Sequence, residues 1–284
     1  MMTEDATITQ DEPPRLGVDA TPAFRIEHLS KTFFPGSRLR PRPPVVAVDD
    51  VSFALPQRST LAVVGESGSG KTTVARMLMG LEVPTSGSIE FLGRPLSVRT
   101  AKDRRRHARS IQMVFQNPYR SLDPRQKVGG SLDEVLKLHT SLSAAERRTR
   151  SRELFELVRL DARLLDSLPS NLSGGQRQRV CIARALACEA RTIVFDEAVA
   201  ALDVLVQAQV LNLLADVQAE THVSYVFVTH DLAVVRQVAD DLVVMQAGRI
   251  VERGEVSAVL DAPQHPYTQR LLAAVPREGW TPGL

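Results

Sequence analysis

The spacing of apolar and polar residues predicts two kinds of strand in this chain. Four short runs are apolar almost throughout, which is typical of parallel strands buried on both faces of a sheet: residues 60–64, 111–115, 192–196 and 225–229. Other segments alternate between apolar and polar positions, as strands do when one face is exposed: residues 24–29, 45–55 and 88–93. We expect residues 45–55 to form a pair of strands, and the alternating strands together to form an antiparallel sheet beside the parallel one.

Helical spacing separates these strands. Residues 74–80 are typical of a helix closed by a glycine. Residues 102–109 are strongly basic and are interpreted as the solvated face of a helix, with a contact to nucleic acid or lipid as the alternative. From residue 123 to about 167 the pattern is mostly helical and charged. The expected fold class is therefore α/β, a mostly parallel sheet with flanking helices, an antiparallel β subdomain and an inserted helical subdomain.

Composition narrows the choice of function. The chain has 284 residues, of which 43% are hydrophobic, and 35 basic against 33 acidic residues leave a net charge of only +2. This balance gives no strong electrostatic footprint for nucleic acid. No apolar run approaches the length of a membrane span and no secretory signal is present, so we expect any membrane role to come through partner chains. The two cysteines, Cys181 and Cys188, lie two helical turns apart and are expected to be buried free thiols.

A glycine-rich loop follows the first apolar run. Residues 65–73 read GESGSGKTT and fit the pattern G-x-x-x-x-G-K-[ST]. Its three glycines lack a Cβ, so the backbone can wrap around an anion with its N–H groups pointing inward. Lys71 supplies a positive charge for β- and γ-phosphates, and the Thr72 hydroxyl can ligate Mg²⁺. Strand, loop and helix in this order predict a nucleotide phosphate site of the P-loop NTPase type.

Polar residues stand at the carboxyl ends of three other apolar runs. In an α/β sheet these ends meet at one edge, where ligands bind. Asp196 and Glu197 end one run, so Asp196 fits a partner of Mg²⁺ and Glu197 is free to polarise an attacking water. Gln116 is a candidate to orient that water or to ligate the metal. His230 is a candidate contact for the γ-phosphate, although a lone histidine is more often structural.

A second candidate anion site lies at the start of a later helix. Residues 172–176 read LSGGQ, with Ser173 placed to cap a helix that continues through several alanines. An ordinary helix cap would explain the serine but not the whole string.

These motifs, in this order, resemble the nucleotide-binding subunit of ATP-binding cassette (ABC) transporters over residues 24 to 277. LSGGQ is the most specific of them. Within the family the chain is most similar to the ATPase subunits of oligopeptide and dipeptide importers, a group that also includes nickel importers. The finer match rests on residues 116–125, 202–211 and 265–272.

The resemblance implies a role for each motif residue. The residues implied to contact the nucleotide are Phe33, Gly65, Glu66, Ser67, Gly68, Ser69, Gly70, Lys71, Thr72 and Thr73. Phe33 is the residue implied to stack on adenine, with Phe34 as the alternative. Catalytic roles are implied for Glu197 as general base, His230 and Gln116, and metal ligation for Thr72, Gln116 and Asp196. The signature expected to act on ATP held by a partner subunit is Leu172, Ser173, Gly174, Gly175 and Gln176, and the dimer-interface loop is Ala201, Leu202 and Asp203.

Domain organisation, cofactors and partners follow from the same resemblance. ATP and Mg²⁺ are the implied cofactors. The implied partners are transmembrane permease subunits, a second ATPase subunit in a head-to-tail dimer and, indirectly, an extracytoplasmic solute-binding protein; no nucleic acid is expected. The implied location is peripheral, on the cytoplasmic face of the membrane. The expected organisation is a disordered tail at 1–23, an ABC ATPase domain at 24–260 with a helical subdomain at about 117–178, and a C-terminal extension at 261–284.

The implied function is that of an ATP-hydrolysing importer subunit, coupling ATP binding and hydrolysis to uptake of a di- or oligopeptide. The alternatives are an importer of nickel or another small solute, and a soluble ABC ATPase without a transport role. Ala198 stands where the family usually has proline and Leu205 where it often has serine; neither change removes a catalytic group. The cysteine cluster that many relatives carry near the C-terminus has no counterpart before Leu284, so no iron–sulfur site is expected.

Overall fold

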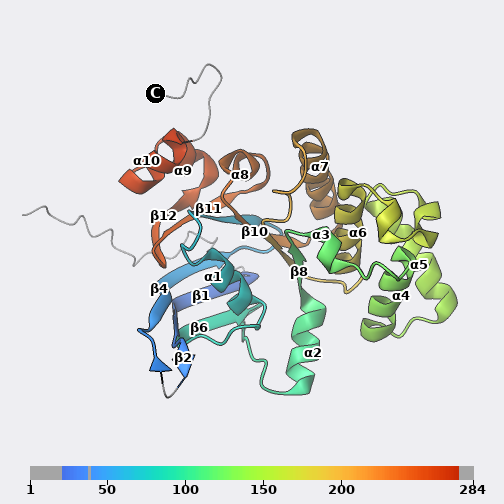
Figure 1. The fold of residues 1–284 in the computed structure, drawn as a ribbon, viewed down its shortest axis with the longest axis horizontal. Coiled ribbons are helices and arrows are strands. Elements are labelled where there is room, and N and C mark those ends of the chain that lie inside the picture. Colours follow the sequence, from blue (N-terminus) through green and yellow to red (C-terminus); the bar gives the residue numbers. More distant parts are fainter. Residues whose placement is uncertain (1–20, 38–39, 275–284) are drawn as a thin grey trace, which may run out of the picture.

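A six-stranded, mostly parallel sheet forms the centre of the computed structural model, which describes residues 21–37 and 40–274 (Figure 1). All four apolar runs are strands of this sheet, as predicted, and they pair in parallel. The sheet adds one more parallel strand, β11, and an antiparallel edge strand, β12. In spatial order its strands are β12 (Arg249–Glu255), β11 (Asp241–Gln246), β5 (Thr60–Val64), β10 (Ser224–Thr229), β9 (Thr192–Asp196) and β8 (Ile111–Phe115).

The predicted antiparallel sheet is also present. Its strands, in spatial order, are β4 (Val45–Leu55), β1 (Phe24–Phe33), β6 (Ser86–Phe91) and β7 (Arg94–Pro95). The expectation of two strands at 45–55 is wrong, because β4 is continuous. The polar pair in its middle is accommodated without a turn: Asp50 takes a φ of 53°, and Asp49 forms an ion pair of 2.7 Å with Arg249.

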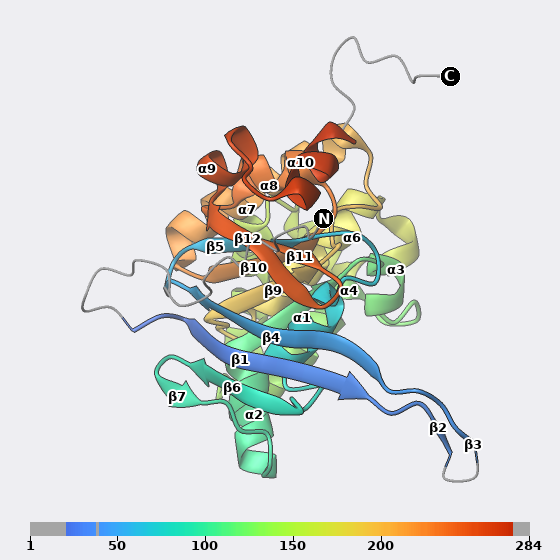
Figure 2. The ribbon, with the colours of Figure 1, turned by 90° about the vertical axis from the view of Figure 1, so that its left-hand side faces the viewer.

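The segment after β1 contains two short paired strands. These are β2 (Gly36–Ser37) and β3 (Arg40–Pro41), which extend from the antiparallel sheet (Figure 2). The predicted tail at 1–23 and extension at 261–284 lie partly outside the described residues. Ala23, at the end of the predicted tail, is buried, and its carbonyl accepts a hydrogen bond of 3.0 Å from the Leu92 N–H.

Helices cover both faces of the parallel sheet. Helix α1 (Lys71–Leu78) packs between the two sheets, where its Val74 and Met77 join a core built from both. The opposite face is covered by α8 (Leu232–Val238), α9 (Val256–Asp261) and α10 (Pro266–Ala273) (Figure 2). The basic segment 102–109 lies in α2 (Ala101–Ser110), none of whose residues is buried, in agreement with the predicted solvated helix.

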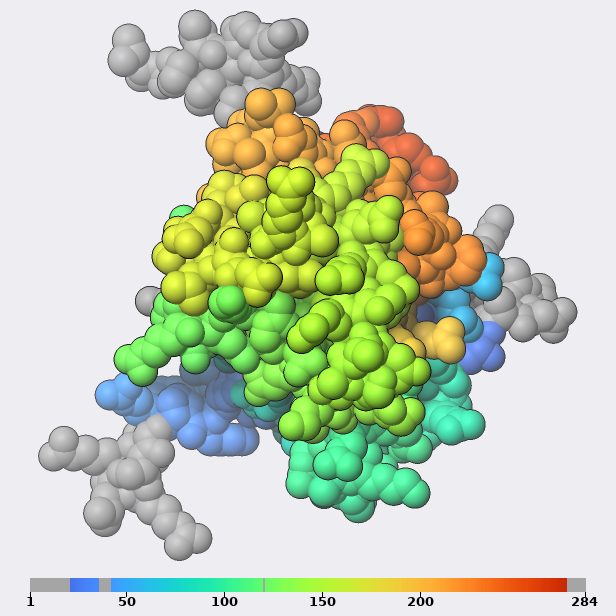
Figure 3. Space-filling model, turned by 90° about the vertical axis from the view of Figure 1, so that its right-hand side faces the viewer, coloured from blue at the N-terminus to red at the C-terminus, as the bar shows by residue number. Residues whose placement is uncertain are grey.

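Most of the remaining helices form a block at one end of the sheet. The space-filling view of that side shows this block with α2 below it (Figure 3). Its elements are α3 (Pro118–Ser121), α4 (Val128–His139), α5 (Ala144–Leu157), η1 (Ala162–Asp166), η2 (Pro169–Asn171) and α6 (Gly174–Leu186).

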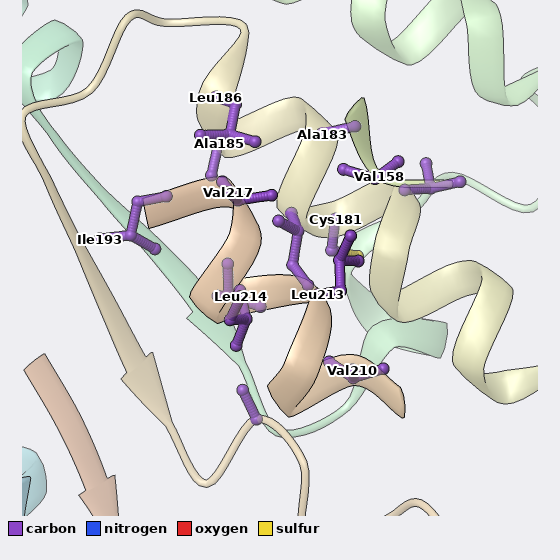
Figure 4. Close-up of a cluster of buried hydrophobic side chains, with 14 of the residues drawn as sticks. Val158, Cys181, Ala183, Ala185, Leu186, Ile193, Val210, Leu213, Leu214 and Val217 are labelled. Atoms are coloured by element: carbon purple, nitrogen blue, oxygen red, sulfur yellow. The ribbon is translucent and has the colours of Figure 1, made fainter. Parts of the chain in front are cut away.

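Helix α7 (Val204–Thr221) joins this block to the sheet. Its Leu213, Leu214 and Val217 pack against α6 and β9 in the largest buried cluster (Figure 4). Cys181 and Cys188 are buried free thiols, as predicted. Within residues 21–37 and 40–274 no helix is both long enough and apolar enough to cross a membrane.

Candidate active site

The glycine-rich loop lies at the carboxyl end of β5, with its backbone pressed against neighbouring strands. Gly65 has a φ of 149°, and a Cβ there would lie 2.1 Å from the Met245 carbonyl oxygen. Gly70 has a φ of 103°, and its Cβ would lie 2.4 Å from the Ala47 carbonyl oxygen. Only glycine fits either position, because any side chain would meet backbone that cannot move aside.

Helix α1 begins directly after this loop and presents unpaired donors to it. The first hydrogen bond of the helix ladder runs from the Val74 N–H to the Gly70 carbonyl at 3.0 Å. The N–H groups of Lys71, Thr72 and Thr73 precede that bond, so they have no acceptor within the helix. Together with the positive end of the helix dipole, these donors suit an anion such as a phosphate.

Lys71 is buried in the loop, with only 5% of its surface exposed. Its Nζ donates to the carbonyls of Gly65 at 2.8 Å and Glu66 at 2.7 Å. Burial lowers the pKa of Lys71, and the nearby carboxylates of Glu197 and Asp196 oppose that shift. The ammonium is therefore held in place before any phosphate arrives.

Asp196 ends β9 beside the first turn of α1. The Thr72 hydroxyl donates to Asp196 Oδ1 at 3.4 Å. Burial raises the pKa of the Asp196 carboxyl; the Thr72 hydrogen bond opposes that shift, whereas the negative charge of Glu197 adds to it. A carboxylate that is costly to ionise next to a hydroxyl fits a cation site.

The protein groups at this position supply only part of a metal shell. Within the described part of the chain, no group of three or more His, Cys, Asp or Glu side chains is arranged to hold a metal ion. This donor set suits Mg²⁺, which binds through one or two protein oxygens together with substrate phosphates and water.

Glu197 is joined to His230 at the same edge of the sheet. Glu197 Oε1 lies 3.1 Å from His230 Nδ1, so the ends of β9 and β10 are linked through these side chains. Glu197 also takes a φ of 49°, in the left-handed region that a non-glycine residue rarely adopts, and its N–H donates to the Val228 carbonyl at 2.9 Å. Such backbone strain persists only where the surroundings fix it, and it is concentrated at functional sites.

The remaining predicted contacts are Gln116 and the aromatic pair Phe33 and Phe34. Gln116 is exposed and directly follows Phe115, the residue that pairs with Asp196 across β8 and β9. Phe33 ends β1 with the Lys31 ammonium 4.9 Å from its ring centroid, whereas Phe34 is 76% exposed. The Phe34 ring is therefore the freer surface for stacking, although the prediction favoured Phe33.

The LSGGQ segment starts α6 with a capping box. The Gln176 N–H donates to Ser173 Oγ at 3.2 Å, and the Ser173 N–H donates to Gln176 Oε1 at 2.9 Å. Gly175 faces α7, where an added Cβ would lie only 2.4 Å from Val206 Cγ1. Asp203, from the predicted dimer-interface loop, caps α7 by accepting from the Val206 N–H at 3.0 Å.

Figure 1 shows α6 in a different part of the molecule from α1. The structure thus brings the loop, Asp196, Glu197 and His230 together. It leaves the LSGGQ segment away from them in the same chain.

Comparison with known proteins identifies the family. The sequence model of the ABC transporter family matches residues 48–200. The dipeptide transport ATP-binding protein DppF of Haemophilus influenzae is 48% identical over 233 residues, which cover 82% of this chain and 71% of the relative. The chain belongs to the ABC transporter family. It is an ATPase of that family and binds ATP.

Further relatives and solved structures agree with this ABC ATPase assignment. DppF of Escherichia coli K12 is 44% identical over 98% of this chain and 80% of the relative. A structure of cbiO1 from Clostridium perfringens, part of the ABC transporter complex cbiONQ, has a TM-score of 0.74 at 25% identity and covers 85% of this chain and 92% of that one. The ATP-binding cassette MJ0796, in a dimer bound to ADP and Pi, has a TM-score of 0.72 at 26% identity and covers 82% of this chain and 98% of that one.

Sequence reasoning missed one contact of the ABC ATPase site. The hydroxyl of Tyr267, in α10, accepts a hydrogen bond of 2.9 Å from the Glu66 N–H in the glycine-rich loop. The two residues are 201 positions apart in the sequence, so no local sequence pattern predicts their contact. Tyr267 also lies beyond residues 48–200, where the family match ends.

Proposed function

We propose that this ABC ATPase is the ATP-hydrolysing subunit of an importer whose solute is a di- or oligopeptide. The observation that carries the proposal is the 44–48% identity to dipeptide transport ATP-binding proteins over 82–98% of the chain. A glutathione import ATP-binding protein, GsiA of Escherichia coli K12, is 44% identical over 91% of this chain, which spans 42% of that relative. Glutathione is itself a short peptide, so this second relative supports the same class of solute.

The glycine-rich loop would bind the phosphates of ATP. The β- and γ-phosphates would take the free N–H groups at the start of α1, and the Lys71 ammonium would move its hydrogen bonds from loop carbonyls to phosphate oxygens. Phe33 or Phe34 would stack on adenine.

Hydrolysis follows from the residues at the carboxyl ends of β9 and β10. Thr72 and Asp196 would hold Mg²⁺, which would neutralise part of the negative charge on the phosphate oxygens. Glu197 would accept a proton from the attacking water, with Gln116 orienting that water or contributing to the metal shell. His230 keeps the Glu197 carboxylate in place through Nδ1 and would lie beside the γ-phosphate.

The position of LSGGQ favours a partner subunit. Because α6 is apart from the loop of its own chain, Ser173 and Gly175 would act on ATP bound by a second ATPase subunit, with Ala201, Leu202 and Asp203 at the interface. Closure of the dimer around two ATP molecules would then move transmembrane permease subunits on the cytoplasmic side of the membrane. An extracytoplasmic solute-binding protein would deliver the peptide.

An uptake assay tests this function. In the strain from which the gene comes, we would delete it and measure uptake of a labelled dipeptide and of ⁶³Ni²⁺, restoring the gene as wild type, as Glu197→Gln, or as Glu220→Gln. The last variant makes the same chemical change at an exposed position of α7.

Dipeptide uptake that is lost on deletion and restored by wild type and Glu220→Gln, but not by Glu197→Gln, supports the proposal. Loss of nickel uptake alone would move the function to the nickel alternative. Uptake unaffected by deletion would favour a soluble ABC ATPase without a transport role.

A further inference from the structure

Helix α10 is fixed at its start by a carboxylate of the parallel sheet. Glu252, in β12, accepts hydrogen bonds from the Gln264 N–H at 2.7 Å and the His265 N–H at 3.1 Å. His265 Nδ1 in turn accepts from the Tyr267 N–H at 3.2 Å and caps the helix, and Pro266 occupies the first turn, where its missing N–H costs nothing. The backbone at Tyr267 therefore has little freedom to move relative to the sheet.

The Tyr267 ring is buried under the strands that lead to the site. It is 2% exposed and packs in a cluster with Val64, the last residue of β5, and with Val244 of β11. Its hydroxyl emerges from this cluster at the glycine-rich loop and accepts the Glu66 N–H at 2.9 Å. Burial raises the pKa of this hydroxyl, so it stays neutral.

The Glu66 N–H belongs to the same peptide unit as the Gly65 carbonyl. That carbonyl accepts a hydrogen bond of 2.8 Å from Lys71 Nζ. A peptide unit is planar, so its N–H and its carbonyl turn together. The Tyr267 hydroxyl thus binds the N–H side of this planar peptide unit, and the Lys71 ammonium binds its carbonyl side.

The contact leaves the phosphate donors untouched. The N–H groups of Lys71, Thr72 and Thr73 lie on the α1 side of the loop, whereas Glu66 lies on the β5 side. Other polar contacts also hold the loop from outside: the Gly248 N–H donates to the Ser69 carbonyl at 3.1 Å, and the Thr72 hydroxyl donates to Asp196 Oδ1 at 3.4 Å. Tyr267 is therefore placed to set the loop's shape without competing with ATP.

We propose that Tyr267 is a positioning residue for ATP binding, which orients the Gly65–Glu66 peptide and through it the Lys71 ammonium. This inference rests on the proposed role of the loop in binding ATP phosphates. It gives α10, the last helix within the described residues, a part in the nucleotide site.

Tyr267→Phe is the direct test, because it keeps the buried ring and removes only the hydroxyl. Tyr225→Phe is the matched control: the Tyr225 hydroxyl is also buried and donates to a backbone carbonyl, that of Leu214 at 3.1 Å, but at the amino-terminal end of β10, away from the loop. Both variants lose one buried hydrogen bond, so both should lose similar stability.

We would measure the Kd for a non-hydrolysable ATP analogue with Mg²⁺ by calorimetry, the KM and kcat of ATP hydrolysis, and the Tm without nucleotide. For Tyr267→Phe we expect Kd and KM to rise about five- to tenfold, about 1–1.4 kcal/mol, with little change in kcat. For Tyr225→Phe we expect Kd and KM to match wild type. A purely structural role for Tyr267 would lower Tm in both variants and leave Kd unchanged in both.

Wild-type affinity in Tyr267→Phe, or an equal loss in Tyr225→Phe, would overturn the inference. Should Tyr267→Phe fail to fold, Glu252→Ala reaches the same contact by freeing the start of α10 while leaving the Tyr267 side chain intact. A raised Kd in that variant supports the inference, and an unchanged Kd overturns it. Failure of the wild-type chain to bind the analogue would instead contradict the proposed nucleotide site itself.

Discussion

Gly175 offers a way to separate packing within the chain from contact with a partner's ATP. In the Gly175→Ala variant the new methyl group would lie 2.4 Å from Val206 Cγ1, whereas ordinary contacts begin at 3.4 Å, so the neighbours must give by about 1 Å. Val206 cannot turn away easily, because a β-branched side chain in a helix has one strongly preferred rotamer and its own N–H is held by Asp203. Overpacking of this kind costs about 1–3 kcal/mol.

The assay is thermal unfolding without nucleotide. We expect Gly175→Ala to lower the Tm by about 2–12 °C, at about 2–4 °C per kcal/mol for a chain of this size. Gly174→Ala is the control, because the nearest atom to its new methyl group, Leu202 Cδ2, is 3.6 Å away and within ordinary contact range. Gly175→Ala/Val206→Ala should regain most of the lost stability, since the second change removes the clashing atom.

Activity then gives a separate result. If Gly175 also touches ATP across the dimer, the rescued double variant will unfold normally yet hydrolyse ATP poorly. A Tm for Gly175→Ala equal to that of Gly174→Ala would refute the packing argument.

Three further variants test the site. Glu197→Gln should keep its affinity for ATP and lose about 10²–10⁴-fold in turnover, as expected for a general base; near-normal steady-state hydrolysis would remove Glu197 from that role. Lys71→Ala should weaken nucleotide binding about 10–100-fold by calorimetry, because a charge-assisted hydrogen bond is lost, and an unchanged Kd would count against the loop assignment. The raised pKa of Asp196 means that its carboxyl holds the proton more tightly in the folded chain than in the unfolded chain. Ionising this carboxyl therefore destabilises the folded chain. The loss of stability increases as the pH rises from the ordinary pKa of 3.8 through the raised pKa of the folded chain. Asp196→Asn should therefore raise the nucleotide-free Tm at pH 7, with the gain shrinking toward pH 4 in a pH series of melts; a lower Tm at pH 7 would contradict this sign.

The sequence was sufficient for features that local patterns encode. Burial on both faces produces an uninterrupted apolar run, so strands β5, β8, β9 and β10 could be predicted, and the glycines of the loop could be recognised from the backbone they permit. The basic helix α2 was equally visible, because a solvated helix has no apolar face.

Features that depend on tertiary packing could not be predicted in the same way. Whether a strand continues through polar residues depends on its neighbours: β4 runs on past Asp49 because Arg249, 200 residues away, pairs with it. The contacts of His230 with Glu197 and of Tyr267 with Glu66 also join distant segments. Each residue type was visible in the sequence, but their distances are set by how the strands and α10 pack.

The buried thiols make the folded chain almost inert to sulfhydryl chemistry. Burial raises the pKa of both Cys181 and Cys188 to about 11, and the two residues are 8% and 2% exposed. At neutral pH only about one such thiol in ten thousand is ionised, and the thiolate is the reactive form. A cysteine introduced on the surface could therefore carry a spectroscopic label without prior removal of the native pair. The slow rate at which Cys181 is modified would in turn report transient opening of the core between α6 and α7 (Figure 4).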